Sequence, residues 1–149
     1  MAENKVKSLV SAEEHSQISR TLLIWLNQYA DKPVKLNFEF LPDDEIGMAL
    51  STIQATYKTN QYIDGSYRAQ YQFKIIYRHK PVTNDDRLAA DEMLNEMASW
   101  AEAREDKPVL GTGKNVLTIR RDAAASLYAR YDDGSEDTQI LMTMRYEVI

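Results

Sequence analysis

The chain has 149 residues, a net charge of −5 at pH 7, 44% hydrophobic positions and 28% charged positions. This length and apolar content fit one domain with its own core and exclude a wholly disordered protein. The absence of cysteine excludes disulfides, thiolate metal ligands and a cysteine nucleophile, and the acidic balance argues against a dedicated nucleic-acid or anionic-membrane binder.

The start of the chain shows no periodic pattern, so we expect a flexible N-terminus at residues 1–10 and a single domain at 11–149. The first residues are too polar for a secretory signal, and no apolar run approaches the ~20 residues of a membrane span. We therefore expect a soluble protein made in a cytoplasm, with no membrane partner.

A first helix is predicted from residue 11 to about residue 30. Ser11 followed by Glu14 is typical of a capping box. Apolar residues recur at helical spacing on one stripe, at Ile18, Leu22, Trp25, Leu26 and Tyr29. Ile24 falls outside this stripe, which indicates either a helix end buried on more than one side or an apolar patch for a partner.

Residues 34–41 alternate apolar and polar side chains, which predicts a half-buried strand. Two further runs, 49–63 and 67–78, also alternate, with the apolar residues at odd positions in both. A three-residue turn, Ile63-Asp64-Gly65, pairs odd with odd positions, whereas a two-residue turn would set an apolar face against a polar one. Gly65 then takes the left-handed conformation that such a turn requires.

This hairpin register places Tyr57 opposite Tyr71, and Ile53 opposite Ile75. The tip, from about residue 58 to 68, is polar and rich in tyrosine, so we expect it to project beyond the core.

Thr83, with Asp85 and Asp86 after it, predicts the start of a second helix that ends before Lys107-Pro108. Three short strands follow at about 115–121, 126–131 and 138–148. On the first of them, neighbouring Arg120 and Arg121 are expected to take one solvated and one salt-bridged position.

The turn Asp132-Asp133-Gly134-Ser135 joins the last two strands. Its length predicts Leu127 and Ala129 opposite Met142 and Ile140.

The order α-β-β-β-α-β-β-β lacks the alternation of single strands and helices that a doubly wound parallel sheet requires. It predicts an α+β fold: a mostly antiparallel sheet with a long β-hairpin and two helices packed on one face.

Few residues suggest catalysis or metal binding. His15 and His79 lie far apart in a chain without cysteine, so a zinc site is not expected and both are expected on the surface. Gly111-Thr112-Gly113-Lys114 lacks the spacing of a phosphate-binding loop and leads into a strand. We expect no catalytic, cofactor-binding or metal-binding residues, no cofactor, and a protein that is not an enzyme.

Acidic clusters keep open one alternative, a small metal-dependent enzyme. It requires carboxylates from Asp43-Asp44-Glu45, Asp85-Asp86 or Asp132-Asp133 to converge in one cleft. Helix capping accounts for the second cluster and turn chemistry for the third, where Glu136-Asp137 also follows.

Nine tyrosines exceed the number that one small core can satisfy, because each buried hydroxyl needs a hydrogen-bond partner. Tyrosine and arginine are enriched at protein interfaces, so the hairpin suggests a protein-binding arm. The alternative is a hairpin folded back over its own sheet. The expected interaction residues are Ile24, Lys58, Gln61, Tyr62, Ile63, Asp64, Tyr67 and Arg68. Acidic residues elsewhere offset the basic ones of the hairpin, so no specific nucleic-acid partner is expected.

Three segments resemble a tailed-phage family, the minor capsid proteins of phages and prophages of Gram-positive bacteria. They are ISRTLLIWLN (18–27), residues 38–78, and YARYDDGSEDTQILMTMRYEV (128–148). The order of elements is also similar to that of the tail terminator proteins of long-tailed phages. The family has no catalytic signature, so no site residue transfers one by one.

The resemblance implies a virion structural protein, a tail terminator that forms a ring, expected to be a hexamer. Such a ring caps the tail tube and joins it to the head, at the head–tail junction of the virion, after assembly in the bacterial cytoplasm. Its partners would be copies of itself, the tail tube protein and a head-completion or connector protein. Another head–tail connector role, in head closure or the neck, is the alternative.

Overall fold

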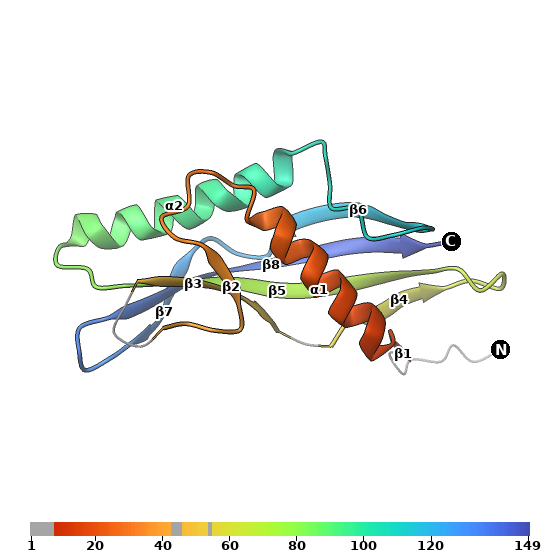
Figure 1. The fold of residues 1–149 in the computed structure, drawn as a ribbon, viewed down its shortest axis with the longest axis horizontal. Helices are drawn as coiled ribbons and strands as arrows, with labels where there is room; N and C mark the ends of the chain where they lie inside the picture. Colours follow the sequence, from red (N-terminus) through yellow and green to blue (C-terminus); the bar gives the residue numbers. More distant parts are fainter. Residues whose placement is uncertain (1–7, 43–45, 54) are drawn as a thin grey trace.

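Two antiparallel strands of thirteen residues, β5 (Tyr67–His79) and β8 (Glu136–Val148), form the centre of the sheet (Figure 1). The computed structural model describes residues 8–42, 46–53 and 55–149. The two strands pair over their whole length, from Tyr67 opposite Val148 to His79 opposite Glu136. Every other strand attaches to this central pair or to one of its neighbours.

Each central strand has two shorter strands in line along its outer edge. β3 (Gly47–Thr52) and β4 (Tyr57–Gln61) lie beside β5. β6 (Lys114–Arg121) and β7 (Ser126–Arg130) lie beside β8. The sheet is extended at two edges by β1 (Ser8–Leu9) next to β4 and by β2 (Leu36–Phe38) next to β3.

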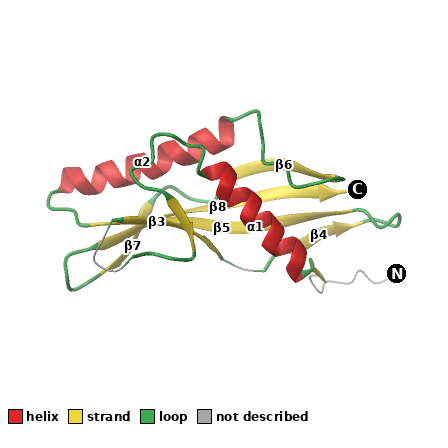
Figure 2. Cartoon of the chain, viewed as in Figure 1, coloured by secondary structure: helices red, strands yellow, loops and turns green. Residues whose placement is uncertain are grey.

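The described residues thus form an α+β fold with a largely antiparallel sheet of eight strands and two helices, and more residues lie in strands than in helices (Figure 2). The pair β2–β3 is parallel. The single strand predicted at 49–63 is two strands, β3, which ends at Thr52, and β4, which begins at Tyr57. Neither helix is long and apolar enough to cross a lipid bilayer.

The helices begin where the sequence predicts. Thr83 caps α2 (Asn84–Ala103) in a full capping box with Asp86. Ser11 caps α1 (Ala12–Leu26) and accepts a hydrogen bond from the amide of Glu14. The reciprocal bond of the predicted capping box is not made, because the Glu14 carboxylate accepts hydrogen bonds from two tyrosine hydroxyls of the sheet instead.

One hydrophobic core joins the sheet to both helices. Strand alternation turns the odd positions of β5 and the even positions of β8 to the same side. Buried residues of α1 and α2 belong to the cluster that these positions form. Its largest fully buried side chains include Leu22 and Leu26 of α1, Leu94 and Met97 of α2, and Tyr71, Phe73 and Tyr146 of the sheet.

The predicted turn of the first hairpin is confirmed. The amide of Tyr62 donates to the Ser66 carbonyl at 2.9 Å, which closes a three-residue loop, and Gly65 has φ +91°. The register beyond the turn is wrong. A bulge between Lys58 and Asn60 shifts the pairing by one residue and leaves Tyr57 opposite Gln70.

The break before β4 shifts the register further, so that Leu50 lies opposite Ile75. The even residues of β3, Met48 and Leu50, therefore face the core, and the predicted core residue Ile53 is partly exposed. A small register slip of this kind exchanges the two faces of a strand.

The second hairpin also differs from its predicted register. The amide of Tyr131 bonds the Ser135 carbonyl, so the loop is Asp132-Asp133-Gly134, with three residues rather than four. The three-residue loop sets Ala129 opposite Asp137, and a bulge between Leu127 and Ala129 adds one residue to β7, so that Leu127 lies opposite Thr138. The predicted partners Met142 and Ile140 are core residues of β8.

The fold begins before residue 11. Ser8 and Leu9 pair with Lys58 and Tyr57, and Val10 is buried in the core. The predicted flexible N-terminus is therefore wrong for residues 8–10, and residues 1–7 lie outside the described part of the chain.

Candidate functional site

The β4–β5 turn carries the exposed apolar part of the predicted arm. Ile63 is fully exposed at its tip, and Tyr62 beside it is 46% exposed. Asp64 accepts hydrogen bonds from the amide and the hydroxyl of Ser66, at 3.0 and 2.6 Å. These bonds stabilise the charged carboxylate and lower the pKa of Asp64 below its usual value. The turn is thus fixed by backbone and side-chain bonds while its apolar tip faces solvent.

Only the end of the hairpin projects. Tyr67 already pairs with Val148 of β8, so residues 62–66 alone extend beyond the sheet at the end where the C-terminus lies (Figure 1). The other predicted arm residues are part of the sheet. Gln61 is exposed at the end of β4, and Lys58 places its ammonium 4.4 Å from the centre of the Tyr67 ring.

Tyr67 makes internal contacts rather than a free interface. Its hydroxyl donates to the Glu14 carboxylate, which also accepts a hydrogen bond from the fully buried Tyr146 at 2.7 Å. Burial and the nearby negative charge raise the pKa of both tyrosines far above the usual value. This cluster attaches the first turn of α1 to the hairpin.

Ile24 is 68% exposed. The alternative that the helix end is buried on more than one side is therefore wrong for this residue. It lies ten residues beyond Glu14, which is about 15 Å along the helix axis. Glu14 bonds Tyr67 at the tip end of the hairpin, so Ile24 and the hairpin tip belong to different surfaces. The nearest hollow on α1 measures about 520 Å³ and lies between the helix and the β2–β3 edge, where Leu23 and Phe38 line it.

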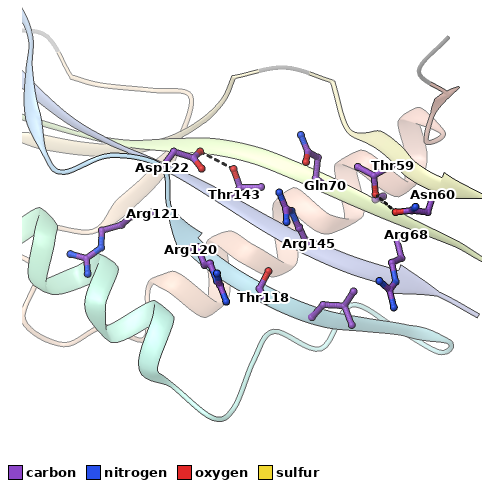
Figure 3. Close-up of a pocket in the computed structure, with 12 residues that line it drawn as sticks. Thr59, Asn60, Arg68, Gln70, Thr118, Arg120, Arg121, Asp122, Thr143 and Arg145 are labelled. Atoms are coloured by element: carbon purple, nitrogen blue, oxygen red, sulfur yellow. Dashed lines mark hydrogen bonds between the residues drawn. The ribbon is translucent and has the colours of Figure 1, made fainter. Parts of the chain in front are cut away.

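No sequence pattern predicts a hollow of about 760 Å³ on the face of the sheet turned away from the core (Figure 3). Even residues of β5 and odd residues of β8 point to this side, as alternation requires. Among the residues lining it are Arg68 of β5, Arg145 of β8 and Arg120 of β6. The first of these was expected in the arm; the structure places it on the sheet face instead.

These three arginines form a diagonal row across three strands. Arg120 lies opposite Thr143, Arg145 is two residues further along β8, and Arg68 lies opposite Glu147, two residues further again. With a strand spacing of ~4.8 Å and a rise of ~3.3 Å per residue, the row spans about 16 Å. In the described part of the chain no hydrogen bond or ion pair is recorded for any of the three side chains.

No carboxylate among the described residues forms an ion pair with the row. Asp122 accepts a hydrogen bond from the Thr143 hydroxyl at 2.7 Å. Glu147 shares the sheet face with Arg68 but forms no ion pair with it among the described residues. Arg121 turns the other way, toward α2, where its guanidinium lies 2.8 Å from Glu102 (Figure 3). The prediction of one solvated and one salt-bridged arginine at 120–121 is confirmed.

A second missed feature is the buried pair Glu136 and Asp137 at the start of β8. Arg78 binds Asp137, while Arg87 and Arg130 approach Glu136 at 3.0 and 3.5 Å. In the sequence these acids directly follow a turn and were expected to belong to it. Their cationic partners lie on β5, α2 and β7, which no local pattern connects.

Both histidines also differ from the expected surface positions. His79 is 6% exposed and stacks on Tyr77, with ring centres 4.8 Å apart. Half-buried His15 lies 2.6 Å from the Thr56 hydroxyl through Nδ1. Both side chains therefore make internal contacts, His79 as a buried residue and His15 as a half-buried one.

The acidic clusters do not form a common cleft in the described chain. Asp86 caps α2, and Asp133 binds Ser135 in its own turn. Among the described residues no group of three or more His, Asp or Glu could hold a metal ion. The cluster Asp43-Asp44-Glu45 lies outside the described residues.

No protein-family profile and no curated protein matches this chain.

Proposed function

We propose that this chain is a virion assembly protein, a tail terminator that forms a ring on the phage tail tube and joins the tail to the head. The hairpin tip carries this proposal: a fully exposed isoleucine on a turn that four hydrogen bonds hold in place. An exposed apolar side chain on a fixed backbone loses little conformational entropy when a partner buries it. It is therefore suited to be an anchor for another protein.

The proposed arrangement has both helices on one face of the sheet. The shared core of α1, α2 and the inward positions of β5 and β8 supports it. The other face and the two ends of the sheet would then be available for neighbouring proteins. In this scheme the hairpin tip, together with Gln61 and Tyr62, contacts the tail tube protein, and the ring is a hexamer.

A ring requires a heterologous contact, in which one surface of a protomer binds a different surface of the next. When the rotation between neighbours closes, such a contact gives a ring without any bond chemistry. The function proposed here is geometric: the ring stops growth of the tube and presents a surface to a head-completion protein at the head–tail junction.

Size-exclusion chromatography with light scattering, followed by negative-stain electron microscopy, tests the ring. We expect a discrete species several times the 17.1 kDa protomer mass, seen as closed rings. A strict monomer at high concentration, both alone and with purified tail tubes, contradicts the proposal.

Co-sedimentation separates the terminator role from a head-closure or neck role. The terminator is expected to sediment with purified tail tubes and not with tailless DNA-filled heads, whereas the alternative predicts the reverse. Ile63→Asp is expected to abolish tube binding without changing the ring, and Val109→Asp is the control at an exposed apolar residue outside the expected interaction residues. Equal tube binding by wild type and Ile63→Asp would remove the hairpin tip from the proposal.

A further inference from the structure

The outer face of α2 has the charge opposite to that of the arginine row. The helix contains six acidic residues and one arginine. Asp85, Glu92 and Glu96 form a helically spaced stripe of exposed acids, and no hydrogen bond or ion pair is recorded for their side chains within the described chain. The single arginine of the helix, Arg87, is already paired with Glu136.

The acidic stripe and the arginine row have the same length. Asp85 and Glu96 are eleven residues apart, which is about 16 Å along a helix with a rise of ~1.5 Å per residue. The row from Arg120 through Arg145 to Arg68 spans about 16 Å by the strand spacing and rise. The three carboxylates and the three guanidinium groups therefore extend over the same length.

Within one protomer the two surfaces cannot meet. The arginine row lies on the sheet face turned away from the core, and α2 packs its buried side, including Leu94 and Met97, into that core. Two complementary surfaces that point away from each other on one molecule are the requirement for a heterologous contact.

Shape and apolar content agree with this contact. The hollow that contains the row is a concave surface of about 760 Å³, and the matching element is a 20-residue helix. Leu88, within the acidic stripe, is 56% exposed, and Leu117, at the edge of the hollow, is 40% exposed. Exposed ion pairs alone contribute little to affinity, so burial of these leucines adds the apolar part of the contact.

We infer that α2 of one copy binds in the arginine-lined hollow of the next copy, with Asp85, Glu92 and Glu96 against Arg120, Arg145 and Arg68. The inference rests on the proposed self-association and specifies the surfaces that make it. Because the two surfaces differ, the contact repeats from copy to copy, and the hairpin tip stays free for a different partner.

A charge-swap experiment tests this contact by light scattering. The sheet variant is Arg145→Glu with Arg68→Glu, and the helix variant is Glu92→Lys with Glu96→Lys, so that the changed residues are partners in the inferred contact. Each variant sets like charges against each other and is expected to raise the concentration of half-assembly at least ~10-fold. The chain that carries all four changes restores opposite charges and is expected to assemble like wild type, as is an equimolar mixture of the two variants.

The control is Arg20→Glu with Lys35→Glu, which changes the net charge as much as the sheet variant does but at exposed positions on neither surface. It is expected to assemble like wild type. Raising NaCl from about 0.05 M to about 0.5 M is expected to weaken wild-type assembly, since exposed charges are screened. Circular dichroism checks that every variant is folded.

Distinct outcomes overturn distinct claims. If wild type assembles and the four-change chain stays monomeric, or if neither variant weakens assembly, the inferred contact is wrong while the ring proposal stands. If wild type is monomeric at all concentrations, the self-association and this inference both fail. If the sheet variant assembles normally but loses salt-sensitive binding to a fluorescent DNA duplex, the arginine row is a nucleic-acid surface instead.

Discussion

Arg78 and Asp137 face each other across β5 and β8 and form a two-bond ion pair, with Nε 2.8 Å from Oδ1 and Nη2 2.9 Å from Oδ2. Asp137 is only 2% exposed, and the Tyr131 hydroxyl donates to it at 2.7 Å. The adjacent carboxylate raises the pKa of Arg78. The pair fixes one end of the central strands to the β7–β8 turn.

Asp137→Ala is expected to lower the free energy of unfolding by about 3–5 kcal/mol, because it leaves a largely buried guanidinium without its partner. Urea denaturation followed by circular dichroism measures the change. Asp132→Ala, at an exposed turn position, is the control and is expected to stay within about 0.5 kcal/mol of wild type. Replacing both partners, in Arg78→Met with Asp137→Leu, is expected to cost less than Asp137→Ala. A larger cost for the double change would contradict this account.

Glu14 holds the start of α1 on the sheet through Tyr67 and Tyr146. Glu14→Ala removes the acceptor of both hydroxyls and is expected to lower the free energy of unfolding by about 2 kcal/mol. Glu13→Ala, one residue earlier and exposed, is the matched control. In the Glu14→Ala background, Tyr146→Phe is expected to cost less than it does in wild type, since its hydrogen bond is already lost. If the losses of stability from Glu14→Ala and Tyr146→Phe add in the double variant, Glu14 does not stabilise the fold through Tyr146.

His79 predicts how stability depends on pH. Burial lowers the pKa of His79 below its usual 6.5, although Glu136, Asp86 and Asp137 act in the opposite direction and Arg87 in the same one. Below pH 6.5 the unfolded chain therefore binds a proton that the folded chain does not. The contribution of neutral His79 is fully present above pH 6.5 and is lost as the pH falls toward the folded pKa.

Thermal unfolding of wild type and His79→Gln measures this effect. The pH range, from about 7.5 to about 5, lies on both sides of the ordinary histidine pKa of ~6.5. The variant is expected to be less stable at pH 7.5, since it loses the stacking on Tyr77. The gap between the two proteins is expected to narrow as the pH falls, because glutamine does not titrate. Parallel curves would assign the pH dependence to other groups.

Local chemistry in the sequence predicted the turns and caps better than the pairing between strands. Thr83 and Ser11 cap helices as expected, and Gly65 closes a three-residue turn. The register failed a few residues from that turn, because a bulge at residues 58–60 carries no marker in the alternation of apolar and polar residues. One extra residue there is enough to exchange the faces of a strand.

The arginine row was missed for a related reason. Arg68, Arg120 and Arg145 are far apart in the sequence, and only the register of β5, β6 and β8 brings them together. Each looks like an ordinary solvated residue on its own strand. The hairpin tip, in contrast, is local in sequence, so Tyr62, Ile63 and Asp64 could be singled out without knowledge of the pairing.

The two hairpin turns share one design, which gives a matched test. Asp64-Gly65-Ser66 and Asp133-Gly134-Ser135 have the same hydrogen bonds from serine to aspartate, and the glycines have φ +91° and +89°. Apart from the glycine itself and its two chain neighbours, no residue has a heavy atom within 4 Å of a Cβ built on either glycine. The cost of Gly65→Ala and of Gly134→Ala is therefore conformational rather than steric.

Each alanine variant is expected to lower the free energy of unfolding by about 1–2 kcal/mol, the cost of a left-handed conformation for a residue with a Cβ. Asparagine tolerates this conformation better, so Gly65→Asn is expected to lose less than Gly65→Ala. Urea denaturation of the three variants measures these changes. A loss well above this range at Gly65 alone would contradict a purely conformational cost. It would mean that the turn makes a contact absent from the isolated chain, such as one between copies. Repeating the measurement at several protein concentrations would identify such a contact.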